Sequence, residues 1–271
     1  ATKHRLHTEK IMTMPSLKQG LRGKSVSIRS FRRNAIGEHV YFVDYPDYFR
    51  LRSQPYGYMD DYKRYYLFSL ACADWLSVLR KEGKGWFPDV IQCHDWHTGY
   101  FVDLIKKNPA YIRIRRIPVV FTVHNFKYQN EKKFQYMDEK NTDTGQEALG
   151  TMVSEKLRSQ NALIRGMKYA ERVNTVSPTH AQEILLPEYS YNLSSFIPTI
   201  RGKLSGILNG LDYSKFDPNM HPYVRYHYSE RNFSAQRHNN KRHLRHIFSL
   251  PDYNDAPVYC YVGRMTSQKG I

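Results

Sequence analysis

The stretch that decides the fold is residues 90–99, which reads Val90-Ile91-Gln92-Cys93-His94-Asp95-Trp96-His97-Thr98-Gly99. A short apolar run is followed at once by a polar cluster, and then by a helical pattern over residues 100–107 that Asn108-Pro109 ends. An apolar run of this length with such flanks is typical of a buried strand in a parallel sheet. Residues 90–99 therefore predict a strand that places two histidines and an aspartate beyond its carboxyl end.

The same arrangement recurs along the chain. Further strands are predicted at residues 39–44, 118–123, 172–176, 204–208 and 258–262, and helices at 60–81, 154–169 and from Ser177-Pro178 onward. No strand or helix is predicted before Ser25, and the polar residues 127–150 predict a long surface loop. Alternating strands and helices predict an α/β fold, a Rossmann-like parallel sheet with helices on both faces. In such sheets ligands bind beyond the carboxyl ends of the strands. Those ends carry His94, His124-Asn125, Ser177 and Gly263-Arg264.

Composition limits the classes of protein to consider. The 271 residues correspond to one large domain or nearly two, and 41% hydrophobic residues are enough for a packed core. No apolar run reaches the roughly 18 residues of a membrane helix, and the first residues do not resemble a signal peptide. Three cysteines disfavour a disulfide scaffold and favour a reducing compartment. The formal charge of +16 fits a phosphate-bearing partner without choosing one.

Two histidines three residues apart, His94 and His97, could bind a metal ion. A zinc site needs three or four ligands, and no cysteine or histidine pair of matching spacing supplies the others, so the sequence disfavours a metal. Two interpretations stay open. In one, Asp95 or Thr98 only caps the helix that follows. In the other, a histidine contacts a ligand in the crevice beyond the strand ends.

The chain has no glycine-rich dinucleotide fingerprint, no P-loop and no Gly-x-Ser-x-Gly element, so Ser177 is interpreted as a helix cap. Arg264 and Lys269 follow a predicted strand and Gly263. Two cations placed in this way suit a pyrophosphate, although a solvated loop explains them equally well.

Residues 225–246 hold six Lys or Arg, four His and a single acid, Glu230. Interleaved aromatic residues could make this segment a nucleic-acid face. Leu244, Ile247 and Phe248 instead have the spacing of an amphipathic helix. The helix is the favoured interpretation, and nucleic acid is disfavoured as a partner.

Seven motifs, in order, carry a resemblance to a known family. They read Val40-Tyr41-Phe42-Val43-Asp44-Tyr45-Pro46-Asp47-Tyr48-Phe49; Asp60-Asp61 with Arg64-Tyr65; Pro88-Asp89 leading into residues 90–99; Phe121-Thr122-Val123-His124-Asn125; Val173-Asn174-Thr175-Val176-Ser177-Pro178-Thr179; Gly202-Lys203-Leu204-Ser205-Gly206-Ile207-Leu208-Asn209-Gly210-Leu211-Asp212; and Arg264-Met265-Thr266-Ser267-Gln268-Lys269-Gly270. From about residue 25 to its last residue, the chain resembles bacterial glycogen synthase and plant starch synthase.

The resemblance implies a retaining hexosyltransferase of the GT-B type, which moves glucose from ADP-glucose to the non-reducing end of an α-1,4-glucan. It implies that His94 is the cleft histidine near the transferred sugar and that Asp60 lies near the catalytic centre. It also implies that Arg264 and Lys269, after Gly263, hold the donor's diphosphate. Asp95, Trp96, His97, His124 and Asn125 are expected to line the cleft. No cofactor or metal is implied, because fixed cations can stabilise the charge of the leaving ADP.

The resemblance also implies a division of the chain. Residues 1–37 are interpreted as a poorly matched basic lead-in, 38–212 as part of the N-terminal Rossmann-like catalytic domain, and 213–256 as an interdomain connector. Residues 257–271 are interpreted as the first strand and phosphate-binding loop of the C-terminal domain. The family's Lys-x-Gly-Gly-Leu loop has no counterpart in residues 1–37. The chain is therefore interpreted as an internal fragment, truncated at both ends and inactive alone. The expected location is the cytoplasm for a bacterial source and a plastid for a plant or algal one.

Four positions depart from the family pattern. Asn130, Asn192 and Ser195 stand where glycines are usual, and Ile164 stands where a lysine is usual, with Arg165 beside it. These departures motivate a second hypothesis, a non-catalytic glucan-binding or regulatory module derived from the family. The residues do not predict the choice between ADP- and UDP-glucose, the acceptor length or the oligomeric state.

Overall fold

The computed structural model describes residues 7–12, 25–33, 38–83, 85–130, 134, 136–251, 256–266 and 269–271. Contacts between residues divide the chain into two compact units, Ala1–Asn209 and Gly210–Ile271. No helix among the described residues is both long and apolar enough to cross a lipid bilayer.

The centre of the first unit is a four-stranded parallel sheet. Its strands are β4 (Ile91–His94), β5 (Val119–Val123), β6 (Arg172–Thr175) and β7 (Leu204–Gly206), and they lie side by side in chain order. The sequence patterns predicted all four strands, and the Rossmann-like parallel sheet is confirmed. Because the strands are parallel, their carboxyl ends meet at one edge of the sheet.

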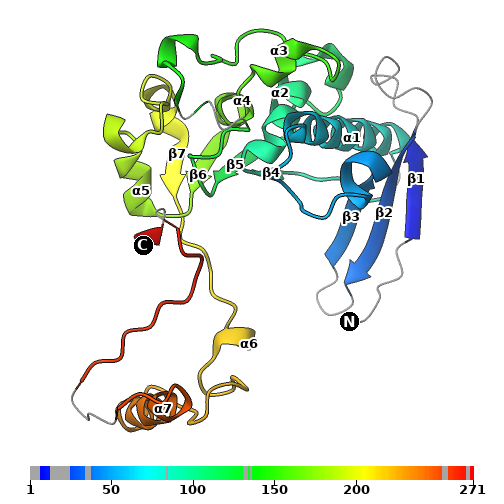
Figure 1. The fold of residues 1–271 in the computed structure, drawn as a ribbon. Helices are drawn as coiled ribbons and strands as arrows, with labels where there is room; N and C mark the ends of the chain where they lie inside the picture. The colour runs from blue at the N-terminus through cyan, green and yellow to red at the C-terminus, as the bar shows by residue number, and fades with distance from the viewer. Residues whose placement is uncertain are drawn as a thin grey trace. The chain divides into compact units, whose positions relative to one another are not determined.

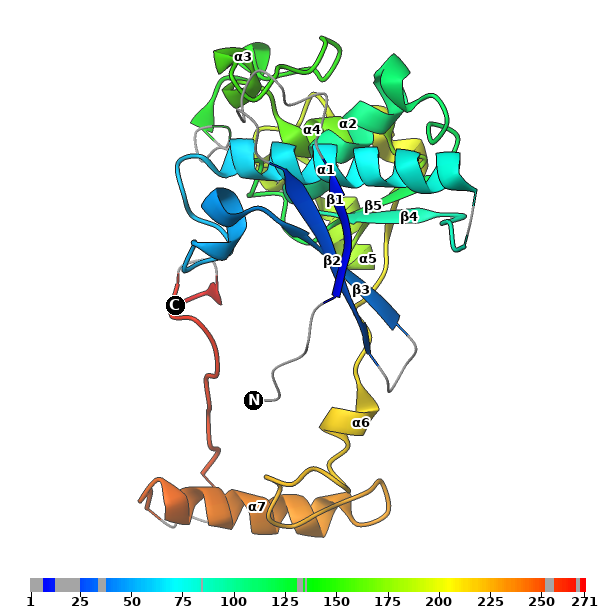
Figure 2. The same cartoon turned by 90° about the vertical axis from the view of Figure 1, so that its right-hand side faces the viewer.

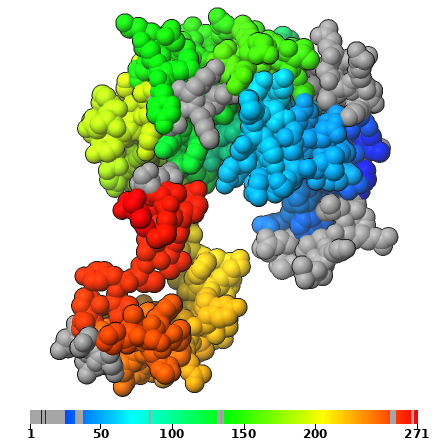
Figure 3. Space-filling model, viewed as in Figure 1, coloured from blue at the N-terminus to red at the C-terminus, as the bar shows by residue number. Residues whose placement is uncertain are grey.

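Helices α1 (Asp61–Glu82), α2 (Gly99–Lys107) and α4 (Ala162–Tyr169) lie together over one face of this sheet (Figures 1 and 2). Cys93, Phe121 and Val173 point to that face and are buried. α4 approaches closely because Gly166 has no side chain: a Cβ atom there would lie 2.3 Å from the Phe121 ring. The space-filling view shows continuous packing in this unit, from the blue strands to the yellow-green α5 (Figure 3).

The opposite face of the sheet is polar. Gln92 Nε2 donates to Thr122 Oγ1 at 3.0 Å, and Thr122 Oγ1 donates to Asn174 Oδ1 at 2.8 Å. Thr122 and Asn174 are buried, whereas Gln92 is exposed. The alternation of strand side chains thus gives the sheet one apolar face and one hydrogen-bonded face.

A second, antiparallel sheet precedes the parallel one and corrects two expectations. It consists of β1 (His7–Met12), β2 (Val26–Arg33) and β3 (Glu38–Asp44) in that order. A strand therefore exists before Ser25, within the stretch that we expected to be a structureless basic lead-in. β3, which we expected in the parallel sheet, pairs antiparallel with β2 instead.

Both corrections have one physical reason: the strands of this sheet are held by backbone hydrogen bonds to one another. β1 begins with four polar residues and pairs with β2 through backbone hydrogen bonds, which leave no apolar pattern in the sequence. β2 does alternate, with Val26 and Ile28 buried between half-buried neighbours. β3 reaches the core through Tyr41, whose ring lies 4.5 Å from that of Trp75 on α1.

The single helix expected over residues 154–169 is two helices, α3 (Glu155–Arg158) and α4. Asn161 breaks the run and starts α4, because its side-chain oxygen accepts a hydrogen bond from the Ile164 backbone N–H at 3.1 Å. The helix predicted after Ser177 is confirmed as α5 (Pro178–Glu183), with Ser177 Oγ accepting from the His180 N–H at 3.2 Å.

The polar stretch 127–150 is not simply a surface loop, since Phe134 within it is buried. Asp143 from the same stretch pairs with the fully buried guanidinium of Arg165 on α4, at 2.6 Å from Nε. Arg165 also contacts Asp103 on α2 at 2.7 Å and donates to the Glu147 carbonyl at 3.0 Å. We call Arg165, Asp103 and Asp143 the buried ion cluster. It fastens the loop to both helices.

Short helical turns complete the first unit. They are η2 (Pro46–Arg50), η3 (Trp96–Thr98), η4 (Pro109–Tyr111), η6 (Glu139–Asn141), η7 (Pro187–Tyr189) and η8 (Ile197–Lys203).

The second unit contains α6 (Tyr213–Phe216) and α7 (Phe233–Ile247), so the amphipathic helix expected within residues 225–246 is present. Residues 258–262, expected as a strand, form none. A strand requires a neighbour for its backbone hydrogen bonds, and the described residues of this unit pair no strand with this segment. The cysteines of the chain, Cys72, Cys93 and Cys260, are all free thiols.

We expect Gly166→Ala to destabilise the first unit by about 1–3 kcal/mol, because the added methyl group meets a ring that is fully buried. The measurement is the urea midpoint of unfolding. Gly202→Ala is the matched control, since nothing lies within 4 Å of its added Cβ. Equal midpoints for the two variants would contradict the close approach of α4.

We expect Arg165→Ala to cost about 3–5 kcal/mol of unfolding free energy, because it leaves two buried carboxylates without their cation. Arg201→Ala, at an exposed position, is the control and should change stability by less than about 0.5 kcal/mol. Chemical denaturation followed by circular dichroism measures both. A loss below 1 kcal/mol for Arg165→Ala would show that the buried ion cluster is dispensable.

Candidate functional site

Two histidines meet at the carboxyl edge of the parallel sheet. His94 is the last residue of β4, and His124 follows β5 directly, with His94 in register with Thr122. His94 Nδ1 lies 3.0 Å from His124 Nε2, and the rings stack with centroids 5.2 Å apart. The parallel pairing of two neighbouring strands therefore brings together residues that are 30 positions apart in the sequence.

Asp95 joins the two strand ends. Its carboxylate Oδ1 accepts a hydrogen bond from the His124 backbone N–H at 2.8 Å, and its own N–H donates to the Thr122 carbonyl at 2.9 Å. Asp95 has φ 55° and ψ −179°, a backbone conformation that residues other than glycine rarely adopt. Strained backbone at a strand end is typical of functional sites.

The helix-cap interpretation of this cluster is wrong for both candidates, because neither side chain caps a helix N-terminus. Asp95 binds the next strand, as described. Thr98 Oγ1 donates backward to the carbonyl oxygens of His94 and Asp95, at 3.0 and 3.1 Å. The polar loop is thus built to hold the strand end.

His97 and Trp96 form a second layer of rings. The two rings stack at 4.2 Å, and Tyr65 of α1 meets the His97 ring edge-on at 4.5 Å. Trp96 is only 5% exposed, so it supports the site from behind and does not line its surface. Asn125, also expected as lining, accepts a hydrogen bond from the Lys127 N–H at 3.0 Å and so shapes the turn after β5.

Both histidines of the loop favour the neutral form. Burial lowers the pKa of His94, the neighbouring His124 lowers it further, and Asp95 opposes both. Burial likewise lowers the pKa of His97, against the opposing effects of Asp95 and Asp61. Within the described part of the chain, no three His, Cys, Asp or Glu side chains gather as metal ligands would.

Asp60 lies at the start of α1, where its carboxylate pairs with Arg52 at 2.6 Å. The next residue, Asp61, is buried. It binds Arg64 and accepts from the Gly57 and Tyr58 N–H groups at 2.6 and 3.0 Å.

Sequence reasoning did not assign roles to Arg52 or to Tyr65. The spacing of Asp61 and Arg64, three residues apart on a helix, is a signal for an ion pair. Nothing in the sequence marks Arg52, because its partner lies across an irregular turn.

At two of the positions where glycine is usual, the backbone angle explains the residue found. Asn130 has φ 81° and Asn192 has φ 63°. Asparagine is among the residues that best tolerate this region after glycine, so the turns keep their backbone. The other two departures make ordinary structural contacts. Ile164 is packed in the core, and the Ser195 N–H donates to Glu139 at 3.1 Å.

Gly263, Arg264 and Lys269 belong to the second unit, where all three are exposed. The Arg264 carbonyl accepts from the Tyr261 hydroxyl at 2.6 Å, and the Lys269 N–H donates to the Thr266 carbonyl at 2.8 Å. Their role at the donor's diphosphate stays a prediction.

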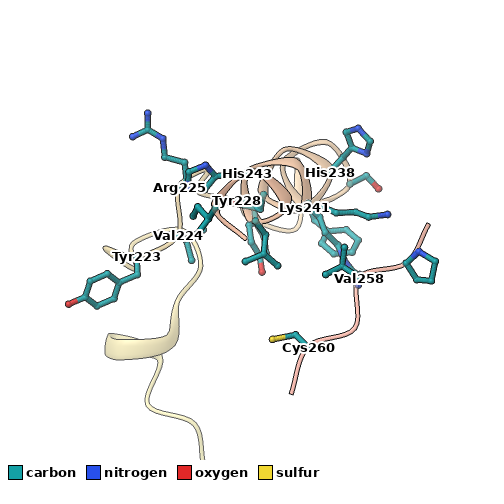
Figure 4. A pocket seen from close by; sticks show the side chains of 16 residues that line it. Tyr223, Val224, Arg225, Tyr228, His238, Lys241, His243, Val258 and Cys260 are labelled. Carbon is teal, nitrogen blue, oxygen red and sulfur yellow. The ribbon is translucent and has the colours of Figure 1, made fainter. Parts of the chain in front are cut away.

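The second unit also holds an open hollow of about 900 Å³ beside α7. Figure 4 shows His238 and Lys241 on the helix and Val258 and Cys260 on the extended segment across from it. Neither Arg264 nor Lys269 lines this hollow.

Comparison with known proteins gives consistent results. Glycogen synthase of Lactococcus lactis is 35% identical over 253 residues, which are 93% of this chain and 51% of that protein. Glycogen synthase of Pasteurella multocida is 33% identical over 244 residues, 87% of this chain and 48% of that protein. The chain thus spans about half the length of the curated relatives it matches.

Among solved structures, the catalytic domain of Starch Synthase IV from Arabidopsis thaliana, bound to ADP and acarbose, superposes with a TM-score of 0.67 at 26% identity. The match covers 92% of this chain and 49% of that one. The model of the starch synthase catalytic domain matches residues 2–199, which include the antiparallel sheet, strands β4, β5 and β6 of the parallel sheet, and the histidine pair. The chain therefore belongs to the family of the starch synthase catalytic domain.

Proposed function

We propose that the protein containing this chain is a glycogen or starch synthase. It transfers glucose from ADP-glucose to the non-reducing end of an α-1,4-glucan and retains the anomeric configuration. The observation that carries the proposal is the His94–His124 pair, which stands at the carboxyl edge of the sheet inside the region that the family model matches. The solved relative bound to ADP and acarbose supports the classes of donor and acceptor.

The proposed roles follow from the chemistry of each group. A neutral His94 imidazole can donate or accept one hydrogen bond to a hydroxyl of the transferred sugar. The Asp60 carboxylate, held by Arg52, supplies a fixed negative charge near the transferred sugar. Arg264 and Lys269 stabilise the charge that develops on the ADP phosphate as the bond to the anomeric carbon breaks. With these two cations at the diphosphate, the proposed reaction requires no metal ion.

We also propose the division of the chain given by the family resemblance. Residues 38–212 serve as the catalytic N-terminal domain, 213–256 as the connector, and 257–271 as the start of the second GT-B domain. The bacterial relatives and the three free thiols support a cytoplasmic location.

We expect the full-length protein to incorporate labelled glucose from ADP-glucose into glycogen. His94→Ala should lower kcat by about 10²–10³, the usual effect of removing one group that stabilises a transition state. Asn108→Ala is the control, because the Asn108 side chain caps the turn after α2, at the far end of that helix from His94.

A different result would point to the second hypothesis. If the full-length wild type bound glycogen in a pull-down yet transferred no glucose from ADP- or UDP-glucose, the protein would be a glucan-binding module. Full turnover by His94→Ala would overturn the role given to His94 and leave the family assignment intact.

The pH dependence should follow the neutral form of His94. Its pKa is lowered, so the imidazole stays neutral at the usual histidine value of about 6.5 and takes up a proton only at lower pH. We expect kcat to be constant near neutrality and to fall on an acid limb centred below that value. An acid limb above pH 7 would contradict this reading of the pair.

A further inference from the structure

The backbone of Asp95 is an anomaly that the proposed roles do not use. With φ 55° and ψ −179°, the residue occupies a region that is essentially restricted to glycine. Such a conformation persists only when surrounding contacts hold it, and it gathers at sites where geometry matters. A glycine at position 95 would adopt it without strain, so the presence of an aspartate requires a contribution from its side chain.

That contribution is a link between two strands. The Asp95 carboxylate receives the His124 N–H at 2.8 Å, while the Asp95 N–H binds the Thr122 carbonyl at 2.9 Å. The two hydrogen bonds lie on either side of Val123, so the end of β5 is held against the end of β4. In the described part of the chain, the Asp95 carboxylate is the side-chain acceptor of the His124 N–H.

The linked backbones each carry one imidazole. His94 directly precedes Asp95, and His124 carries the N–H that the carboxylate binds. The distance of 3.0 Å between His94 Nδ1 and His124 Nε2 allows one proton between the two nitrogens. Which nitrogen holds that proton decides whether His94 Nε2 donates or accepts toward a ligand.

We propose that Asp95 is a positioning residue, which holds the His94 and His124 imidazoles as one hydrogen-bonded pair and thereby fixes the hydrogen-bonding state that His94 offers to the sugar. The inference rests on the proposed function for the identity of the sugar, but its geometric part does not. Asp95 acts through the histidines and does not itself contact substrate.

The charged groups around the pair define how it responds to pH. His124 and Asp95 are the charged groups that act on His94, in addition to burial, which is the largest effect. Asp61 and Arg64 of α1 act on His97. Burial and His124 lower the pKa of His94, and Asp95 raises it.

Two substitutions separate the charge of Asp95 from its role as an acceptor. Asp95→Asn and Asp95→Ala remove the same negative charge, but only asparagine keeps a side-chain oxygen for the His124 N–H. Asparagine also tolerates positive φ. Asp95→Gly relieves the strain and loses the acceptor, so it serves as the second test if Asp95→Ala does not fold.

The variants are made in the full-length protein, and kcat, KM and the pKa of His94 are measured, the last by NMR titration. We expect Asp95→Ala and Asp95→Gly to lower kcat by about tenfold to a hundredfold, since small misplacements have effects of this size. KM for ADP-glucose should change less than about threefold, while Asp95→Asn should keep kcat within about threefold of wild type.

The pKa of His94 should move in opposite directions in the two charge-removing variants. In Asp95→Asn the pair persists without the charge that raised the pKa, so the value falls below that of wild type. In Asp95→Ala the pair can separate, which relieves the lowering effect of His124; because that effect is larger than the raising effect of Asp95, the value rises. The acid limb of the kcat profile should follow the same directions. Asn108→Ala should alter neither property.

The proposal is overturned if Asp95→Asn is as impaired as Asp95→Ala, because charge would then matter and positioning would not. It is equally overturned if His94 has the same pKa in both variants. A wild type without glucosyl transfer would defeat the proposed function alone, since the NMR titration would still decide whether Asp95 holds the histidine pair.

Discussion

The structure depends on the parallel pairing of β4 with β5. Parallel strands cannot be joined by a tight turn, so the chain must cross over through α2 before it returns. That crossover buries α2 against one face and aligns the ends of both strands at one edge. The stacked histidines are a result of this register, and a shift of one residue would turn their side chains to opposite faces.

The parallel sheet was predictable because its strands lie in short runs with apolar or β-branched residues, separated along the chain by helical patterns. The antiparallel sheet was not, because β1 is paired with β2 through backbone hydrogen bonds and four of its six residues are polar. Similarly, the break at Asn161 depends on one capping oxygen inside a run whose periodicity continues across it. The hydrophobic pattern predicts elements that bury an apolar face, and it misses elements that depend on hydrogen bonds to a neighbouring element.

The candidate site also has features that the sequence could predict and features that it could not. His94, Asp95 and His124 could be predicted because they follow strands, and strand ends meet at one edge. Their mutual contacts could not, since they depend on a backbone angle at Asp95 and on the register of β4 with β5. The resemblance identified Asp60 but not Arg52, which reaches it across eight residues of irregular chain. Arg264 and Lys269 were singled out as two cations after a predicted strand, and the resemblance gave them their role; they belong to the second unit.

The three free thiols differ in chemical reactivity. Burial raises the pKa of Cys72 and of Cys93 to about 12, although Cys93 is next to His94 in the chain. Thiolates are the nucleophilic form, so alkylating reagents should leave the core of the first unit untouched under native conditions. Cys260 is exposed in the second unit. A maleimide fluorophore would therefore label that unit selectively, and energy transfer from native tryptophans, which all lie in the first unit, would report the distance between the two units in solution.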